Sequence, residues 1–125
     1  MKVIRLANLK DTAREVKDPR GGFTSERALL ESDGMGFAMT RTTIYPIGIQ
    51  KWHYKKHLEA CYCVSGHGTL HDENGQEWSI SPGTLYALDK HDKHTFTAHT
   101  EVVLICVFNP ALIGPELHNE DGSYD

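Results

Sequence analysis

The second half of the chain alternates between short apolar runs and turn residues. Turns are predicted at Gly66-His67-Gly68, Pro82-Gly83 and Asn74-Gly75, the last being the strongest two-residue hairpin signal in the chain. Strands are predicted over residues 59–64, 69–71, 77–80, 84–88, 94–98 and 102–108, with a polar loop at 89–93. The last strand is almost wholly apolar and is therefore expected at the centre of a sheet. Short strands at this spacing predict an all-β double-sheet jelly roll.

The two ends of the chain carry weaker signals, and helix is expected only in short terminal pieces. Residues 8–17 are polar with widely spaced apolar positions, and Thr12 with Glu15 has the pattern of a capping box, so a short helix is predicted there. Residues 18–22 are rich in glycine and proline and predict a turn. Residues 111–125 form a polar tail without periodicity.

Between that turn and the regular strands, residues 23–30 fit either a helix or a strand, and a strand is predicted because the segments after it have strand patterns. Asp33-Gly34 has the pattern of a hairpin turn, and a second strand is predicted over 36–45 until Pro46. Trp78 is expected in the core, since it alternates with inward-facing positions.

Length and composition narrow the class of partner. At 125 residues with 39% hydrophobic and 24% charged residues, the chain is expected to form one globular domain over 1–125. The net charge of -4 and the lack of a basic block argue against nucleic acid and favour a small molecule. No apolar run approaches the roughly 20 residues of a membrane span, and no signal peptide is recognised, so no membrane partner and a cytoplasmic location are expected. The three cysteines fall in apolar runs, which suits reduced, buried thiols.

Strand parity selects the residues that would face the interior of such a barrel. Residues two apart share a face, so Glu59 lies on the same face as Cys61, and Tyr86 on the same face as Leu88. If these faces line the interior, Glu59 and Tyr86 are buried polar groups that need partners. A metal ion is one partner that would satisfy them.

Two stretches resemble the sequence motifs of the cupin superfamily, whose fold is a double-stranded β-helix, or jelly-roll barrel. His53, Glu59 and Gly66 keep the first motif, whereas Lys55 occupies its second histidine position. In the second motif, Tyr86 stands where a histidine ligand is usual, and His94 lies eight residues later.

The cupin resemblance implies a three-ligand metal site of Glu59, Tyr86 and His94 with open coordination positions, suited to iron, manganese or zinc. The alternative from spacing is that Glu59 pairs with Lys55 or Lys56, that Tyr86 packs with its hydroxyl satisfied, and that His94 caps a loop.

Longer strings identify a closer resemblance, to the L-ectoine synthase family. They are His53-Tyr54-Lys55, Leu58-Glu59-Ala60, Tyr62-Cys63, Pro82-Gly83-Thr84-Leu85-Tyr86, Leu88-Asp89, His91-Asp92, His94, Cys106-Val107-Phe108-Asn109-Pro110, His118 and Glu120-Asp121-Gly122-Ser123-Tyr124. The resemblance implies a cytoplasmic, homodimeric hydro-lyase that closes N4-acetyl-L-2,4-diaminobutyrate to the compatible solute ectoine with loss of water.

The family also implies roles for individual residues. Glu59, Tyr86 and His94 would hold Fe(II), with other divalent metals as alternatives. The candidate catalytic residues are Tyr54, Glu116 and His118, and the candidate substrate-binding residues are Phe23, Arg27, Thr40, Thr42, Cys106 and Phe108. Arg27 suits the substrate carboxylate because a guanidinium forms two charge-assisted hydrogen bonds with it.

One departure and two rival functions remain at the level of sequence. The family usually has tryptophan where this chain has Phe23, so any hydrogen bond from the indole N–H is missing. The rivals are another metal-dependent cupin enzyme, such as an isomerase or a dioxygenase, and a non-catalytic small-molecule-binding cupin.

Overall fold

The structure is a computed structural model, and it describes residues 1–124. Two antiparallel sheets make up the fold. The six-stranded sheet has the order β1-β2-β3-β10-β5-β8 and the four-stranded sheet the order β4-β9-β6-β7. The strands are β1 (Glu15–Lys17), β2 (Phe23–Leu29), β3 (Ala38–Ile44), β4 (Ile49–Trp52), β5 (Leu58–Ser65), β6 (Gly68–Asp72), β7 (Glu77–Ile80), β8 (Leu85–Leu88), β9 (His94–Ala98) and β10 (Val102–Asn109).

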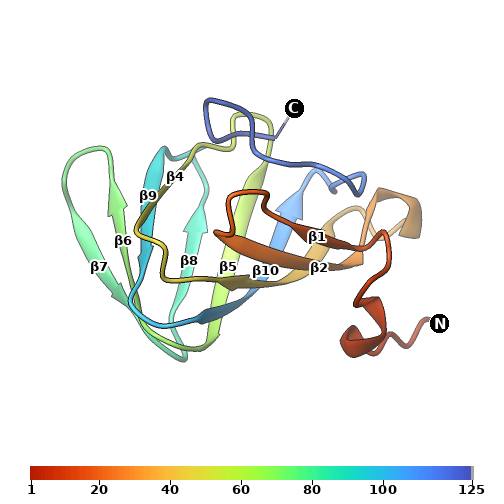
Figure 1. Ribbon diagram of the computed structural model, residues 1–125. Coiled ribbons are helices and arrows are strands. Elements are labelled where there is room, and N and C mark those ends of the chain that lie inside the picture. Colours follow the sequence, from red (N-terminus) through yellow and green to blue (C-terminus); the bar gives the residue numbers. More distant parts are fainter. Residues whose placement is uncertain (125) are drawn as a thin grey trace.

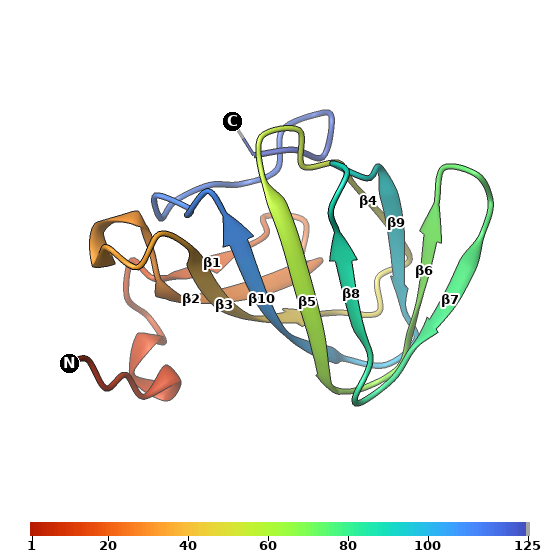
Figure 2. The same ribbon diagram turned by 180° about the vertical axis from the view of Figure 1, so that it is seen from behind.

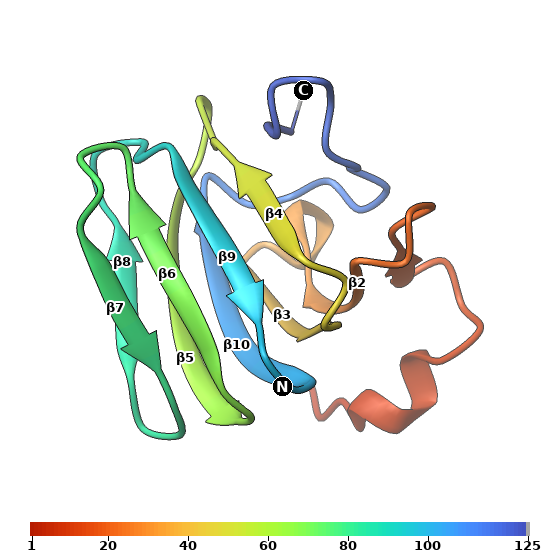
Figure 3. The same cartoon turned by 60° about the vertical axis from the view of Figure 1, so that its left-hand side comes forward.

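The two sheets face each other and enclose the core, as Figures 1 and 2 show from opposite sides. In Figure 3 the strands β4, β6, β7 and β9 form the near layer, with β5, β8 and β10 behind them. The C-terminal segment crosses one end of the barrel, and the N-terminal segment lies outside it beside β1 and β2. The predicted all-β, cupin-type jelly roll is therefore confirmed.

Alternation along the strands explains which side chains fill the interior. In β10, residues Val102, Leu104, Cys106 and Phe108 are buried, while the residues between them are more exposed. β10 lies between β3 and β5, which confirms the predicted central strand. The Asn74-Gly75 hairpin is confirmed too, because β6 pairs with β7 and Gly75 adopts a φ of 80°.

The helix predicted over 8–17 is wrong. A 3-10 helix, η1, covers Leu6–Leu9 instead, and residues 15–17 form β1 at the edge of the larger sheet. Thr12 and Glu15 close turns rather than cap a helix: the Thr12 hydroxyl donates to the Leu9 carbonyl, and the Glu15 carboxylate accepts from the Asp11 N–H.

Two further expectations need correction. The β2–β3 connection is longer than a two-residue turn, because it includes a 3-10 helix, η2 (Glu31–Asp33), with Gly34 at a φ of 73°. Trp78 faces inward in register with Leu70, as expected, but 41% of it is exposed. It lies on β7, an edge strand of its sheet, where the neighbouring layer does not cover it.

The described residues contain no helix with the length and apolar character needed to cross a membrane.

Candidate active site

A small cavity lies between the sheets, close to the C-terminal segment. Its volume is about 30 Å³, and its wall is largely aromatic, with Phe23, Trp52, Tyr54, Phe108 and Tyr124. Glu59, Cys61, Cys106, Thr42 and His118 add polar groups to that wall. Such a volume holds about two water molecules. A substrate with an amino-acid skeleton therefore needs the surrounding side chains or the C-terminal segment to shift.

A second cavity, of about 300 Å³, opens between β7 and β8. Tyr86 lines both of these cavities, whereas Glu59 is in the wall of the small one and His94 in the wall of the large one. The three predicted metal ligands thus line two cavities that share Tyr86.

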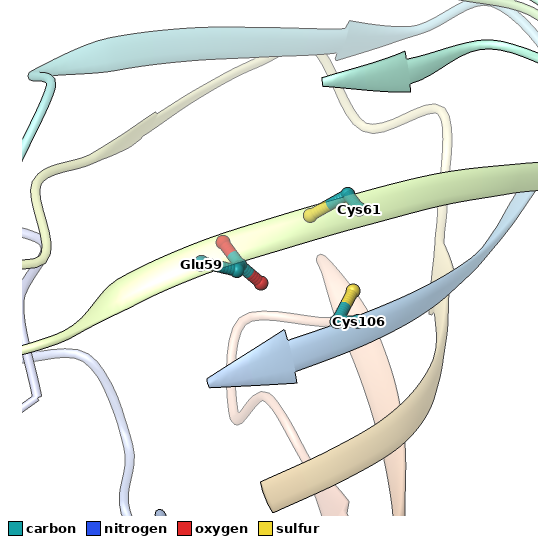
Figure 4. A group of neighbouring side chains, drawn as sticks. All are labelled: Glu59, Cys61 and Cys106. Atoms are coloured by element: carbon teal, nitrogen blue, oxygen red, sulfur yellow. The ribbon is translucent and has the colours of Figure 1, made fainter. Parts of the chain in front are cut away.

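Glu59 is a buried carboxyl on β5. Burial raises its pKa to about 7, an effect that the Cys61 and Cys106 thiols partly offset. Cys61 and Cys106 stand directly opposite each other on β5 and β10. The ligand atoms of the three residues lie within 4.8 Å of one another (Figure 4). The predicted free, buried thiols are confirmed.

Tyr86 and His94 line the larger cavity from different sheets. Tyr86 pairs with Cys61 across β8 and β5, and burial raises the pKa of its phenol well above the usual value. His94, at the start of β9, is 4% exposed. Its Nδ1 lies 2.8 Å from the Asp92 carbonyl oxygen, which can only accept, so Nδ1–H donates and Nε2 keeps its lone pair. This buried Nε2 has no hydrogen-bond partner among the described residues.

Tyr54 and His118 form the shortest side-chain contact of the small cavity. The Tyr54 hydroxyl lies 2.7 Å from His118 Nε2. Burial lowers the pKa of His118 to about 3 and raises that of Tyr54 well above its usual value, so both groups are neutral at pH 7. In the tautomer in which the phenol donates to Nε2, the imidazole hydrogen sits on Nδ1, which is buried and has no partner in the described part of the chain.

Three aromatic rings hold the His118 imidazole in place. Tyr124 stacks on it at 4.6 Å between ring centroids, Trp52 stacks at 5.5 Å, and Phe23 meets it edge-on at 5.1 Å. Trp52 and Tyr124 were not among the predicted site residues. Trp52 lies on a strand that the sequence pattern did not predict, and Tyr124 lies in the tail without periodicity.

Arg27 is fully buried beside the C-terminal segment. Its Nη1 donates to the Gly114 carbonyl at 2.6 Å, and its Nε donates to the Ser25 hydroxyl at 3.2 Å. Its guanidinium carbon lies 5.5 Å from the centre of the Tyr124 ring. Nη2 is buried without a hydrogen-bond partner within residues 1–124, and Arg27 is not among the residues that line the small cavity.

Glu116 anchors the backbone next to Arg27. Its carboxylate accepts the N–H groups of Ile113 and Gly114, each at 2.7 Å, and lies 3.7 Å from Arg27. Burial would raise the pKa of Glu116, but these hydrogen bonds and the Arg27 charge outweigh it, and the pKa is lowered. Glu116 is not among the cavity-lining residues, and this geometry suits a positioning role.

The remaining predicted substrate-binding residues divide between the cavity and its support. Phe23, Thr42, Cys106 and Phe108 line the small cavity. Thr40 is buried behind it, with its hydroxyl 3.1 Å from that of Thr42.

Comparison with known proteins decides the family. The family model described as ectoine synthase matches residues 1–125. The chain belongs to the ectoine synthase family. L-ectoine synthase from Marinomonas sp. (strain MWYL1) is 47% identical over 121 residues, covering 96% of this chain and 94% of that protein.

Solved structures agree with this family and with the fold. The crystal structure of ectoine synthase from P. lautus has a TM-score of 0.89 and 39% identity, covering 98% of this chain and 87% of that one. An RmlC-like cupin from Shewanella frigidimarina has a TM-score of 0.61 at 17% identity, covering 76% of this chain and 82% of that one. The second likeness shows the cupin fold alone.

Proposed function

We propose that this protein is an L-ectoine synthase, a hydro-lyase that closes N4-acetyl-L-2,4-diaminobutyrate to ectoine with loss of water. The full-length family match carries this proposal. The small, largely aromatic cavity supports it, because its apolar wall leaves little room for water and a dehydration is favoured where water is excluded. Holding the flexible substrate in a folded shape contributes as well, since well-oriented intramolecular reactions reach effective molarities of roughly 10⁵ M or more.

The reaction makes a clear demand on proton transfer. The 2-amino nitrogen attacks the acetyl carbonyl carbon, a C–N bond forms, and the carbonyl oxygen leaves as water. The attacking nitrogen gives up two protons and the oxygen gains two. The site therefore needs groups that accept a proton beside the nitrogen and donate one beside the oxygen.

The Tyr54–His118 pair meets this demand as a neutral relay. The Tyr54 oxygen accepts a proton from the nitrogen while its own proton passes to His118 Nε2 over the 2.7 Å hydrogen bond. Nδ1–H, which is free of other partners in the described residues, gives its proton to the departing oxygen. Between passages a water molecule gives a proton to Nδ1, Nε2 returns its proton to the Tyr54 oxygen, and Tyr54 gives one proton to water, so the starting tautomer is restored and a second passage completes the loss of water. Because neither group ends a passage charged, the buried setting does not oppose the relay.

Glu59, Tyr86 and His94 fit the role of cation ligands. Glu59 and Tyr86 are polar groups whose charged forms burial disfavours, and a cation would reverse that penalty. His94 offers an unpartnered Nε2 lone pair, and the Asp92 carbonyl fixes its tautomer. We assign Fe(II) to this site. When bound, it supplies Lewis-acid polarisation of the substrate carbonyl.

Arg27 is the proposed partner of the substrate carboxylate. Its Nη2 is buried and unpartnered among the described residues, and Glu116 and the Gly114 carbonyl hold the other side of the guanidinium. Thr42, Phe23, Cys106 and Phe108 supply the wall that folds the substrate between Arg27 and the relay.

Two properties of the family are proposed for the whole molecule. A homodimer is supported by exposed apolar residues on the outer face of the larger sheet, among them Tyr62, Val64, Leu85 and Val107. A cytoplasmic location is supported by three free, buried thiols, which suit a reducing compartment.

Product analysis tests the proposed activity. The protein is incubated with Fe(II) and N4-acetyl-L-2,4-diaminobutyrate, and the mixture is separated by chromatography. Ectoine should accumulate as substrate disappears, and L-2,4-diaminobutyrate, which lacks the acetyl carbonyl, should give no product. Absence of a cyclic product from the acetylated substrate would overturn the proposal and favour a different metal-dependent cupin reaction.

A further inference from the structure

Two thiols and a carboxylate converge on the wall of the small cavity. Cys61 and Cys106 face each other directly across β5 and β10, and Glu59 precedes Cys61 by two residues on the same face of β5. Figure 4 shows the three side chains gathered on these neighbouring strands. Their ligand atoms lie within 4.8 Å of one another, and all three residues are at least nine-tenths buried.

This donor set differs in kind from Glu59, Tyr86 and His94. Two sulfur donors and one oxygen donor favour thiophilic cations, whereas oxygen and imidazole donors favour iron or manganese. Bonds of about 2.3 Å to sulfur and 2.0 Å to oxygen place tetrahedral donors about 3.5–3.8 Å apart. Shifts of about 1 Å in the ligand atoms, by rotation of the side chains, therefore suffice to bring all three residues onto one ion.

We propose that Glu59, Cys61 and Cys106 form a second metal site, which binds one thiophilic divalent cation such as Zn²⁺ or Cd²⁺. The cation displaces the protons of both thiols, and that of Glu59 where it is protonated, to solvent, because coordinated thiols and carboxyls are deprotonated. It also occupies Glu59 and so excludes Fe(II) from the proposed catalytic set. This exclusion rests on the proposed function, whereas binding to the trio does not.

Metal chemistry determines which cation excludes the other. Zn²⁺ binds a given set of nitrogen, oxygen and sulfur ligands more tightly than Fe²⁺ does, and thiolates increase that preference. The cavity therefore selects Fe(II) only where thiophilic cations are scarce, and a small excess of Cd²⁺ or Zn²⁺ inhibits turnover through the cysteines.

Cadmium titration tests the second site directly. The full-length protein is treated with a chelator and titrated with Cd²⁺ while the ultraviolet thiolate-to-cadmium charge-transfer band is recorded. One equivalent should produce the band in the wild type. Cys61→Ser and Cys106→Ser should each weaken Cd²⁺ binding by at least about tenfold, the lower range for losing a group that supports a metal.

Cys63→Ser is the matched control. Cys63 is equally buried on β5, but its Sγ donates to the Ser65 carbonyl and it is absent from both cavities. This variant should keep the full band. Circular dichroism checks that each variant is folded. If one of Cys61→Ser and Cys106→Ser does not fold, the other still tests the site, because the two cysteines lie on different strands. Loss of the band in Cys63→Ser, or its persistence in both Cys61→Ser and Cys106→Ser, overturns the proposal.

His94→Ala separates the two sites. It should retain the Cd²⁺ band, because His94 belongs only to the proposed iron set. Equal loss of the band in His94→Ala and Cys106→Ser would place the cation among the iron ligands and overturn the second site. Since this titration does not require turnover, a failure of the proposed enzyme activity leaves its outcome readable.

Discussion

Glu59 shows how one buried carboxyl links stability to chemistry. It lies among thiols and aromatic rings, so in the cation-free protein burial raises its pKa from 4.5 to about 7. The native state then binds this proton more tightly than the unfolded state does. The resulting stability is fully present below pH 4.5 and is lost as the pH rises through about 7.

This linkage predicts a pH-dependent difference between the wild type and Glu59→Gln. The pKa difference corresponds to about 3 kcal/mol in the free energy of unfolding. Without cation, the stability of the wild type relative to Glu59→Gln should fall by about that amount between pH 4.5 and 7.5. His118 titrates in both proteins and drops out of the comparison. Denaturant unfolding at several pH values measures the difference in free energy of unfolding between the two proteins. A difference that does not change with pH would refute the raised pKa of Glu59.

Phe23 stands at a position where the family resemblance implies tryptophan. It is 3% exposed, lines the small cavity and meets the His118 ring edge-on. This contact is apolar and needs no indole N–H, so Phe23 acts as wall that keeps the imidazole in place.

We therefore expect Phe23→Trp to change turnover and substrate affinity by less than about tenfold, the ratio that a net hydrogen bond of roughly 1.4 kcal/mol would add. The larger ring should also lower stability by about 1–3 kcal/mol through overpacking. Kinetics of the two proteins measured side by side test this. A gain of tenfold or more in kcat/KM for Phe23→Trp would mean that the missing indole N–H matters.

At the scale of elements, the C-terminal segment completes the site. Leu112 and Tyr124 are buried in it, and the His53 N–H donates to the Gly122 carbonyl at 2.8 Å. The segment carries His118 and Tyr124 against the barrel. Gly122 has a φ of 77°, and a Cβ there would lie 2.6 Å from the Lys51 carbonyl oxygen and 2.9 Å from the Trp52 Cα.

Gly122→Ala should therefore lift the segment from β4. We expect a loss of about 1–3 kcal/mol in stability from the strained backbone, with turnover falling more steeply because His118 moves. Gly75→Ala is the matched control, since Gly75 has a φ of 80° but nothing within 4 Å of the added Cβ. It should cost about 1 kcal/mol and leave kcat unchanged. Equal effects of the two substitutions on kcat would contradict the closing role.

The elements differ in how well the sequence predicts them. The strands β5 to β10 were predicted nearly to their ends, because their apolar alternation directly reflects burial. β4 was missed because Gln50 is buried within it, its amide donating to the Gly22 carbonyl at 3.0 Å. β1 was mistaken for helix because its pairing with β2 is a contact between segments, which local capping signals do not encode.

The candidate site shows the same division. Strand parity alone predicted that Glu59 and Cys61 share an inward face, and the structure places both on the cavity wall. His118 and Glu116 were named only through family resemblance, since the tail has no periodicity. Trp52 and Tyr124 were missed by both routes. Their positions depend on the tail packing over β4, which no local pattern predicts.

At the scale of the whole molecule, the larger sheet has an apolar outer face. Tyr62, Val64, Leu85 and Val107 lie on the adjacent strands β5, β8 and β10 and are 46%, 49%, 62% and 36% exposed. β10 is central and provides surface but no free edge. The edges of this sheet are β1 and β8. Such a contiguous apolar face is typical of an interface.

Light scattering at micromolar concentration should give twice the mass of the chain. Leu85→Lys places a charge on the apolar face and should shift the protein towards monomer. Ile47→Lys is the control, since Ile47 is 53% exposed on the loop before β4 and lines a pocket with residues of β4 and the C-terminal segment. A monomeric wild type, or equal effects of the two substitutions, would contradict the homodimer.

The central claim is that cyclisation depends on a cation bound by the proposed ligands Glu59, Tyr86 and His94. The most direct test measures iron content and ectoine formation in the same samples of wild type, His94→Ala and His99→Ala. His99 is the matched histidine: its Nε2 lies 2.7 Å from the Thr69 hydroxyl, and it lines neither cavity. His94→Ala should lose both iron and turnover while remaining folded, and His99→Ala should keep both. A folded His94→Ala protein with wild-type iron content and turnover would contradict the account.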